Sequence, residues 1–452
     1  MEYLQLVVDY VLGLGSQVFL PLVMILVGLL VKMKFSEAFS AGLTLGVAFV
    51  GMGTIVGFMF SFISPAAEAL VENSGITLTA IDVGWAPLAA IAWAWPYAFF
   101  MFPIQIAINI AMIALNKTST LNVDLWNVWN KILTAVMVAA ISGSVAMALV
   151  VGAIQVVIEL WNADLTQKQI YNITGIPGVS CPHSMTVFGV VLNPFNKLME
   201  KIPGLNANVD AYVLKEKIGI FAENHVMGFI IGNLIGFAAG YSWQDALNLG
   251  ISTGTALTLF PMVAKLFMVA LSPISDAAGE FMKKRFPGRE FFIGLDWPFL
   301  AGSPELWVAA VLLVPVTLLF SIILPGNNVL PLGGIINICL VVPLLIVTGG
   351  NLIRMVVMGI LASPIFLYVG TVLAPIITDL AIETGTYAVP AGQLISWAGM
   401  EMPVFRYVFS RAANIINGDF LGIVMLVAWA GLWYLYVKEF TARNKKFEEE
   451  EA

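Results

Sequence analysis

Long apolar segments, separated by short polar ones, recur from one end of the chain to the other. A transmembrane helix needs roughly 20 mostly apolar residues, and most of these segments reach or approach that length. The pattern therefore predicts an all-α polytopic membrane protein. The segments lie near residues 5–31, 40–63, 86–115, 133–160, 219–241, 245–271, 299–324, 333–349, 351–376 and 420–437.

Two further stretches are interrupted by glycine and proline and do not fit a plain spanning helix. They cover residues 172–196 and 388–412. Backbone that leaves helical geometry at membrane depth is tolerated only where protein or a water-filled cavity satisfies its polar groups. We therefore expect re-entrant or broken helices here, and about 9–11 transmembrane crossings in the whole chain.

The composition agrees with a membrane protein and excludes several other classes. Of the 452 residues, 60% are hydrophobic and 11% are charged, whereas a soluble domain has about a quarter charged residues. The net charge is −7 and no basic stripe occurs, so nucleic-acid binding is not expected. Cys181 and Cys339 lie far apart in apolar surroundings, and neither a disulfide nor a cysteine metal site is expected. The chain lacks a GxxxxGK[ST] loop and an HExxH motif, so we expect no cofactor, no metal and no ATP hydrolysis by that route.

Lysine and arginine indicate the orientation, because cytoplasmic loops of membrane proteins are enriched in both. The first apolar segment has no basic residue before it, and Lys32 and Lys34 follow it. The tail at 438–452 carries further basic residues. We expect a periplasmic N-terminus, a cytoplasmic C-terminus and an odd number of crossings. Because the first segment is long enough to span and lacks a basic start, no cleavable signal is expected.

A sequence pattern occurs twice, about half a chain apart. Pro182 begins a P-x4-VF-x4-N-x2-N motif that recurs at Pro403, a displacement of 403 − 182 = 221 residues. Ser64-Pro65 followed by Trp85 similarly resembles Ser272-Pro273 followed by Trp297. Two matches in the same order favour a duplicated chain. We expect a first repeat at 1–218, a second at 219–437 and a charged cytoplasmic tail at 438–452.

The loop charges further predict that the two repeats are inverted. The loop at 66–84 has no lysine or arginine, whereas its counterpart after Pro273 is basic; the loops after Asn193 and Asn414 show the reverse. Inverted repeats with broken helices are typical of alternating-access transporters. A channel, a receptor or a multispan enzyme with a coincidental periodicity is the alternative.

Ionisable residues in membrane segments are costly, so each is a candidate for function. His183 and Ser184 lie at the bend of the first broken stretch, and Glu401 lies in the second. An imidazole there can exchange hydrogen bonds with sugar hydroxyls, or it can serve packing alone. The Glu401 carboxylate can accept hydroxyl donors from a polyol, carry a proton or pair with Arg406.

Five further residues complete the candidate substrate-binding set. Asp296, Trp297 and Glu305 surround a Trp-Pro turn, where acids can bind hydroxyls while an indole covers the apolar side of a sugar. An interfacial tryptophan belt with solvated acids is the alternative. Gln105 is a lone polar residue on an aromatic segment. His225 begins a helix, where capping or gating is as reasonable as ligand binding.

With these residues in place, the chain resembles the galactitol-specific membrane component (IIC) of the bacterial phosphoenolpyruvate-dependent sugar phosphotransferase system. The resemblance covers essentially the whole chain. It rests on the motifs beginning at Glu2 and Gly13, on Thr174-Gly-Ile-Pro-Gly178 with its Cys-Pro-His183 turn, on Ala222-Glu-Asn-His225, and on Gly294-Leu-Asp296-Trp-Pro.

This resemblance implies a homodimer in the bacterial inner membrane, each protomer with a dimerisation scaffold and an elevator-type core. It implies uptake of a hexitol, which a cytoplasmic phosphocysteine IIB protein phosphorylates with phosphate delivered through IIA. The chain itself would be a non-catalytic permease subunit. His183 and Asp296 resemble residues that line the substrate pocket in the wider superfamily. A proton-coupled polyol transporter using Glu401 or Asp296, and a passive channel, are the competing hypotheses.

Overall fold

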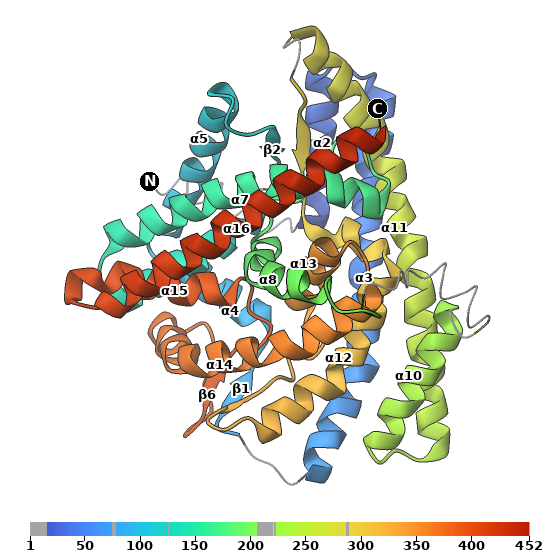
Figure 1. The fold of residues 1–452 in the computed structure, drawn as a ribbon, viewed down its shortest axis with the longest axis vertical. Coiled ribbons are helices and arrows are strands. Elements are labelled where there is room, and N and C mark those ends of the chain that lie inside the picture. The colour runs from blue at the N-terminus through green and yellow to red at the C-terminus, as the bar shows by residue number, and fades with distance from the viewer. Residues whose placement is uncertain are drawn as a thin grey trace.

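The computed structural model describes residues 16–74, 78–124, 126–205, 220, 223–285 and 289–451. Helices dominate these residues, in agreement with the all-α polytopic membrane class (Figure 1). Some expectations fall outside the described residues: the motifs at Glu2 and Gly13, residue Ala222, and the division between repeats at 218.

The elements before this division alternate long helices with very short strands. In chain order they are α2 (Ser16–Leu30), α3 (Phe35–Ser74), β1 (Ala80–Asp82), α4 (Trp85–Ala94), α5 (Met101–Ala114), β2 (Thr120–Asn122), α6 (Trp129–Ser142), α7 (Val145–Thr174), β3 (Val179–Ser180) and α8 (Gly189–Met199). Short 3₁₀ turns cover Ala98–Phe100 (η1), Trp126–Val128 (η2) and Ser184–Phe188 (η3).

The elements after the division follow nearly the same order. They are α10 (Asn224–Ala238), α11 (Trp243–Arg285), β4 (Phe292–Gly294), the 3₁₀ turn η5 (Trp297–Gly302), α12 (Pro304–Ile323), β5 (Val329–Leu330), α13 (Ile338–Thr348), α14 (Leu352–Thr384), β6 (Leu394–Ser396) and α15 (Pro403–Ala413). A turn at Asn414–Asn417 (η6) leads to α16 (Phe420–Glu451), which continues without a break through the expected boundary at 438.

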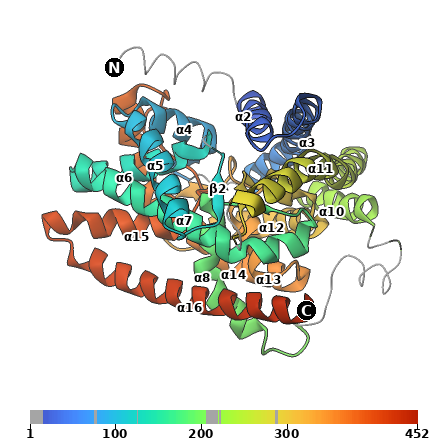
Figure 2. The ribbon, with the colours of Figure 1, turned by 90° about the horizontal axis from the view of Figure 1, so that it is seen from above.

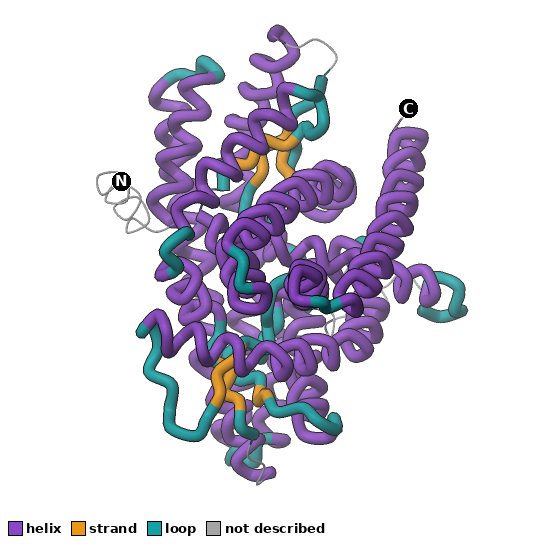
Figure 3. The backbone as a smooth tube through the Cα atoms, turned by 90° about the vertical axis from the view of Figure 1, so that its left-hand side faces the viewer, coloured by secondary structure: helices purple, strands orange, loops and turns teal. Residues whose placement is uncertain are grey.

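The six strands form two small parallel sheets, with the orders β5-β1-β6 and β2-β4-β3. Each central strand comes from one half of the chain and both of its neighbours come from the other half. Ile81 of β1 is paired with Ile395 of β6, and Ile293 of β4 is paired with Val179 of β3. Figure 3 shows the two sheets as separate groups of strands. The halves are therefore interleaved rather than placed side by side.

Six helices of the described chain are long and apolar enough to cross a membrane, or seven if α4 and α5 count as one bent span. Three shorter apolar helices cover 18–30, 224–238 and 338–348. The structure thus confirms a polytopic membrane protein, while the crossing number of about 9–11 remains a prediction.

Two expected spans are interrupted. The segment 86–115 bends by 95° between α4 and α5, next to Pro96, which lacks the backbone N–H that a continuous helix needs. Within the segment 133–160, α6 ends before Gly143, whose φ is +70°. Ser144 then caps α7, because its side chain accepts a hydrogen bond from the Met147 amide at 3.3 Å. Hydropathy alone hides these breaks because the flanking residues remain apolar.

The helices differ in how deeply they are buried. The residues of α13 from Cys339 to Thr348 are all buried, and α13 lies near the middle of the molecule in Figure 1. By contrast, only 17% of the most apolar part of α16 is buried within the chain. Figure 2 shows α16 along one edge of the molecule, away from α2, α3, α10 and α11. The exposed apolar face of α16 is therefore available to lipid or to another chain.

Helices α10 and α11 pack closely through glycine. A Cβ on Gly228 of α10 would lie 2.6 Å from the Cα of Gly254 on α11, and a Cβ on Gly232 would lie 2.7 Å from the Leu249 carbonyl oxygen. Both obstacles are backbone atoms, which cannot move without separating the helices. Small residues that allow such close approach are typical of helix contacts in membranes.

We predict that Gly228→Ala lowers the thermal stability of the detergent-solubilised protein. Overpacking of this kind costs about 1–3 kcal/mol, enough to lower the unfolding midpoint measurably. Gly57→Ala is the matched control, because a Cβ at Gly57 meets no atom within 4 Å and alanine is the better helix former. Equal midpoints for the two variants would show that the α10–α11 contact does not need glycine.

Candidate functional site

All six strands end at one cavity of about 550 Å³. Because neighbouring strands are parallel within each sheet, the carboxyl ends of each sheet lie at the same edge, and the residues that follow both edges line the cavity. They are Gly84 and Trp85 after β1, Asn127 after β2, His183 after β3, Asp296 and Trp297 after β4, Gly333 and Gly334 after β5, and Trp397, Gly399 and Glu401 after β6.

His183, Asp296 and Glu401 lie together in this cavity. The Nε2 atom of His183 is 3.3 Å from Oδ1 of Asp296 and 3.9 Å from Oε1 of Glu401. The side chains of His183 and Glu401 are almost fully buried, at 2% and 6% exposure, and that of Asp296 is 15% exposed. Three residues that are far apart in the sequence thus present one imidazole and two carboxyl groups to the same space.

The hydrogen bonds of His183 determine which nitrogen faces the cavity as a donor. Its Nδ1 atom accepts a hydrogen bond from the Met185 amide at 3.3 Å. A neutral imidazole with an accepting Nδ1 carries its proton on Nε2. The Nε2–H group therefore points toward Asp296, and the site offers both a donor and carboxylate acceptors.

Aromatic rings form a second wall of the cavity. The ring centroids of Trp85 and Trp129 are 6.1 Å apart, and those of Trp129 and Trp397 are 6.3 Å apart. Trp297 also lines the cavity, beside Asp296. An arrangement of indole faces beside a few polar groups suits a ligand that has both C–H and hydroxyl surfaces.

Asp82 organises the glycine wall on the other side. Its Oδ1 accepts from the Gly84 amide at 3.0 Å, and its Oδ2 accepts from the Gly334 amide at 2.7 Å. These bonds connect the loop after β1 to the loop after β5. A Cβ on Gly333 would lie 2.5 Å from the Gly84 nitrogen, so the two loops approach closely only because glycine is present.

A fully buried ion pair lies next to the histidine loop. The Nζ atom of Lys131 on α6 is 2.5 Å from Oε2 of Glu159 on α7, and both side chains are 1% exposed. The other oxygen, Oε1, accepts from the Ser184 hydroxyl at 2.9 Å and from Nε2 of Gln155 at 2.7 Å. The pair therefore connects α6 and α7 to the residue that follows His183.

Arg406 forms a second buried connection, between α15 and α6. Its Nη2 donates to Oδ1 of Asn130 at 2.6 Å and its Nε donates to the Thr134 hydroxyl at 3.2 Å. The expected alternative, a pairing of Glu401 with Arg406, is not among the ion pairs within 4.0 Å in the described part of the chain.

The remaining predicted site residues lie elsewhere. Ser184 is buried behind the cavity at Glu159. Glu305 accepts from the Ser303 hydroxyl at 2.6 Å in the first turn of α12. Gln105 is buried on α5, where its side-chain nitrogen and oxygen have no hydrogen-bond partner among the described residues. His225 is 63% exposed, at 3.4 Å from Glu223. None of these four lines the cavity.

The sequence reasoning missed several residues of the site. Asn127 and Trp129 line the cavity, and they come from a polar, tryptophan-containing segment between two predicted spans. Glu159 lies inside the predicted span 133–160 and Lys131 lies just before it. The rule that intramembrane ionisable residues are functional candidates already applied to Glu159.

These features define an integral membrane protein whose broken helices enclose a polar, tryptophan-lined cavity, which is the architecture of a membrane permease. Comparison with known proteins identifies the family. The family model described as PTS system sugar-specific permease component matches residues 10–392. The chain belongs to this family.

Three similar proteins come from Escherichia coli. The PTS system galactitol-specific EIIC components of strain K12 and of O157:H7 are each 34% identical over 395 residues, covering 86% of this chain and 87% of the relative. A K12 protein whose name provisionally describes it as a permease IIC component is 31% identical over 409 residues, covering 87% of this chain and 93% of the relative. The expected family is confirmed, and the chain is a PTS sugar permease component.

We predict that Lys131→Met strongly destabilises the protein, because it leaves the Glu159 carboxylate buried without its cation. Breaking a buried ion pair costs about 3–5 kcal/mol. The double variant Lys131→Met, Glu159→Gln removes both charges and keeps an acceptor for Ser184, so it should recover much of this loss. Thermal unfolding of the purified variants measures both effects. A double variant as unstable as the single one would contradict charge compensation.

Proposed function

We propose that the cavity binds a hexitol, galactitol or a close relative, and that the protein carries it inward across the bacterial inner membrane. The observation that supports this most is the meeting of His183, Asp296 and Glu401 beside the tryptophan wall. The galactitol-specific names of two relatives also favour it.

The chemistry of a hexitol matches these groups. Each carbon of a sugar alcohol carries a hydroxyl that both donates and accepts hydrogen bonds. The carboxylates of Asp296 and Glu401 accept from hydroxyls, and the Nε2–H of His183 donates to a hydroxyl oxygen. Indole faces cover the C–H surface of the carbon chain. A cavity of about 550 Å³ lies within the size range of small-molecule sites.

We further propose that residues 1–218 and 219–437 are inverted repeats that alternate access to this cavity. The repeated element order and the reciprocal exchange of strands support the duplication. The reversed loop charges support the inversion, with the N-terminus periplasmic and the C-terminus cytoplasmic. In this proposal a homodimer holds the scaffold fixed while an elevator-type core moves the cavity across the bilayer.

Coupling in this proposal comes from phosphorylation. A cytoplasmic IIB protein with a phosphocysteine, charged through IIA, phosphorylates the hexitol when the cavity faces inward. The permease chain contributes binding and translocation, and the phosphoryl chemistry takes place on IIB. A charged phosphate ester does not readily recross hydrocarbon, so uptake becomes one-way.

A proton-coupled polyol transporter is the second candidate. The placement of His183 between the buried Glu401 carboxyl group and the partly exposed Asp296 carboxyl group favours it, because such groups are typical of intramembrane proton relays.

We predict that His183→Ala and Asp296→Asn each weaken equilibrium binding of radiolabelled galactitol by about 10- to 100-fold, since each removes a hydrogen bond of about 1.5–3 kcal/mol involving a buried polar group. His225→Ala is the matched control, because His225 is exposed and does not line the cavity; its affinity should equal that of the parent. Normal binding by both cavity variants, with unfolding curves like the parent's, would place the substrate elsewhere.

Uptake by right-side-out membrane vesicles distinguishes the two candidates. We predict that accumulation requires phosphoenolpyruvate and the soluble phosphotransferase proteins including IIB, persists when a protonophore collapses the proton gradient, and yields hexitol phosphate. Accumulation of unmodified hexitol that stops with the protonophore would instead support the proton-coupled transporter.

A further inference from the structure

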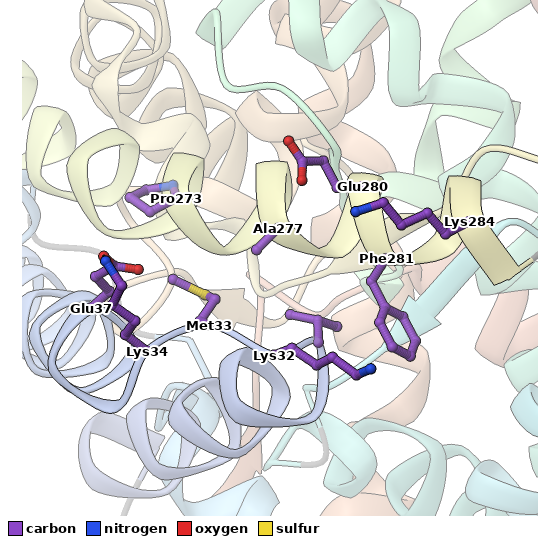
Figure 4. Close-up of a pocket in the computed structure, with 10 residues that line it drawn as sticks. Lys32, Met33, Lys34, Glu37, Pro273, Ala277, Glu280, Phe281 and Lys284 are labelled. Atoms are coloured by element: carbon purple, nitrogen blue, oxygen red, sulfur yellow. The ribbon is translucent and has the colours of Figure 1, made fainter.

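A second cleft lies between the α2–α3 turn and the C-terminal part of α11 (Figure 4). Its volume is about 660 Å³. None of the residues that line it also lines the central cavity. They are Val31, Lys32, Met33, Lys34 and Glu37 on one side and Pro273, Ala277, Glu280, Phe281 and Lys284 on the other.

The cleft has three lysines and two glutamates. Lys34 is 3.3 Å from Glu37, and both side chains are largely exposed. Lys32 and Lys284 make no ion pair within 4.0 Å with any residue that the structure describes, although Glu280 lies one turn before Lys284 on α11. Figure 4 shows Lys32 on the α2–α3 turn and Lys284 on α11, on opposite sides of the cleft. Two cationic groups are thus available to an anion between them.

The cleft lies where two candidate membrane spans end. The span in α3 begins at Phe35, directly after Lys34, and the span in α11 ends at Ala278, shortly before Lys284. Helix ends of this kind place their flanking side chains at the level of lipid headgroups. Lysines at this level experience the negative surface potential of anionic lipids.

Apolar side chains continue from the cleft along the outside of α2 and α3. Leu30 and Phe35 are each 65% exposed, and Phe39 is 47% exposed and stacks on Phe35 with 5.6 Å between ring centroids. Met33 and Phe281 add apolar surface within the cleft itself. Cationic groups above a lipid-facing apolar flank suit an amphiphile better than a wholly polar ligand.

We propose that this cleft binds the phosphodiester headgroup of an anionic phospholipid, such as phosphatidylglycerol. Lys32 and Lys284 contact the phosphate from the two sides, and the acyl chains lie along the exposed flank formed by Leu30, Phe35 and Phe39. The site is separate from substrate binding, and it connects the α2–α3 turn to α11 through the lipid.

The test is binding of phosphatidylglycerol to the delipidated full-length protein in neutral detergent, measured by native mass spectrometry, with phosphatidylcholine as the zwitterionic comparison. Each lysine near an anionic lipid surface contributes about 1 kcal/mol, so the double variant Lys32→Gln, Lys284→Gln should lose about 10- to 30-fold in affinity for phosphatidylglycerol. Phosphatidylcholine binding should stay unchanged.

The matched control is Lys438→Gln, Lys445→Gln, which removes two exposed lysines from α16, on the other side of the molecule from α2 (Figure 2). This control should bind phosphatidylglycerol like the parent, and galactitol binding should be the same in all three proteins. Equal lipid affinity of the cleft variant and the parent, or an equal loss in the control, would overturn the proposal. So would full competition by inorganic phosphate, which would indicate a free-anion site, or a change of oligomeric state in the cleft variant, which would indicate a second copy.

Discussion

The structure depends on one constraint: backbone polar groups that leave a helix inside a membrane must find partners within the protein. Six short strands interrupt the helices of this chain, and each pairs in parallel with a strand from the other half. The pairing satisfies the backbone where the helices break. It also connects the halves through the order β5-β1-β6 and its counterpart β2-β4-β3, so neither half forms its sheet alone.

The central cavity follows from this arrangement. Parallel pairing brings all carboxyl ends of a sheet to one edge, and the loops that leave both sheets supply His183, Asp296, Glu401 and the tryptophan wall. Buried charges outside the cavity are paired or hydrogen-bonded: Lys131 with Glu159, and Arg406 with Asn130. These buried pairs fix the helices and loops that carry the polar groups of the cavity.

Hydropathy predicted the membrane class, and the glycine and proline residues predicted both broken stretches. The recurring motif drew attention to His183 and Glu401 at the two broken stretches, and the structure brings their side chains to 3.9 Å from each other. The strand pairing was not predictable, because two or three residues such as Val179–Ser180 give no periodic signal. The break at Gly143 was not predictable from hydropathy either, because the segments on both sides of it are apolar. Glu305 is a carboxylate of the kind expected in a polyol site, but it lies beyond the Trp-Pro turn, in the first turn of α12.

In the function proposed above, the substrate lies in the cavity at the carboxyl ends of the six strands. An experimental structure determined with galactitol bound tests this most directly. We expect density for the hexitol within hydrogen-bonding distance of His183, Asp296 and Glu401, with its carbon chain against the indoles of Trp129 and Trp397. Hexitol density at any other place, with the central cavity filled only by water, would contradict it.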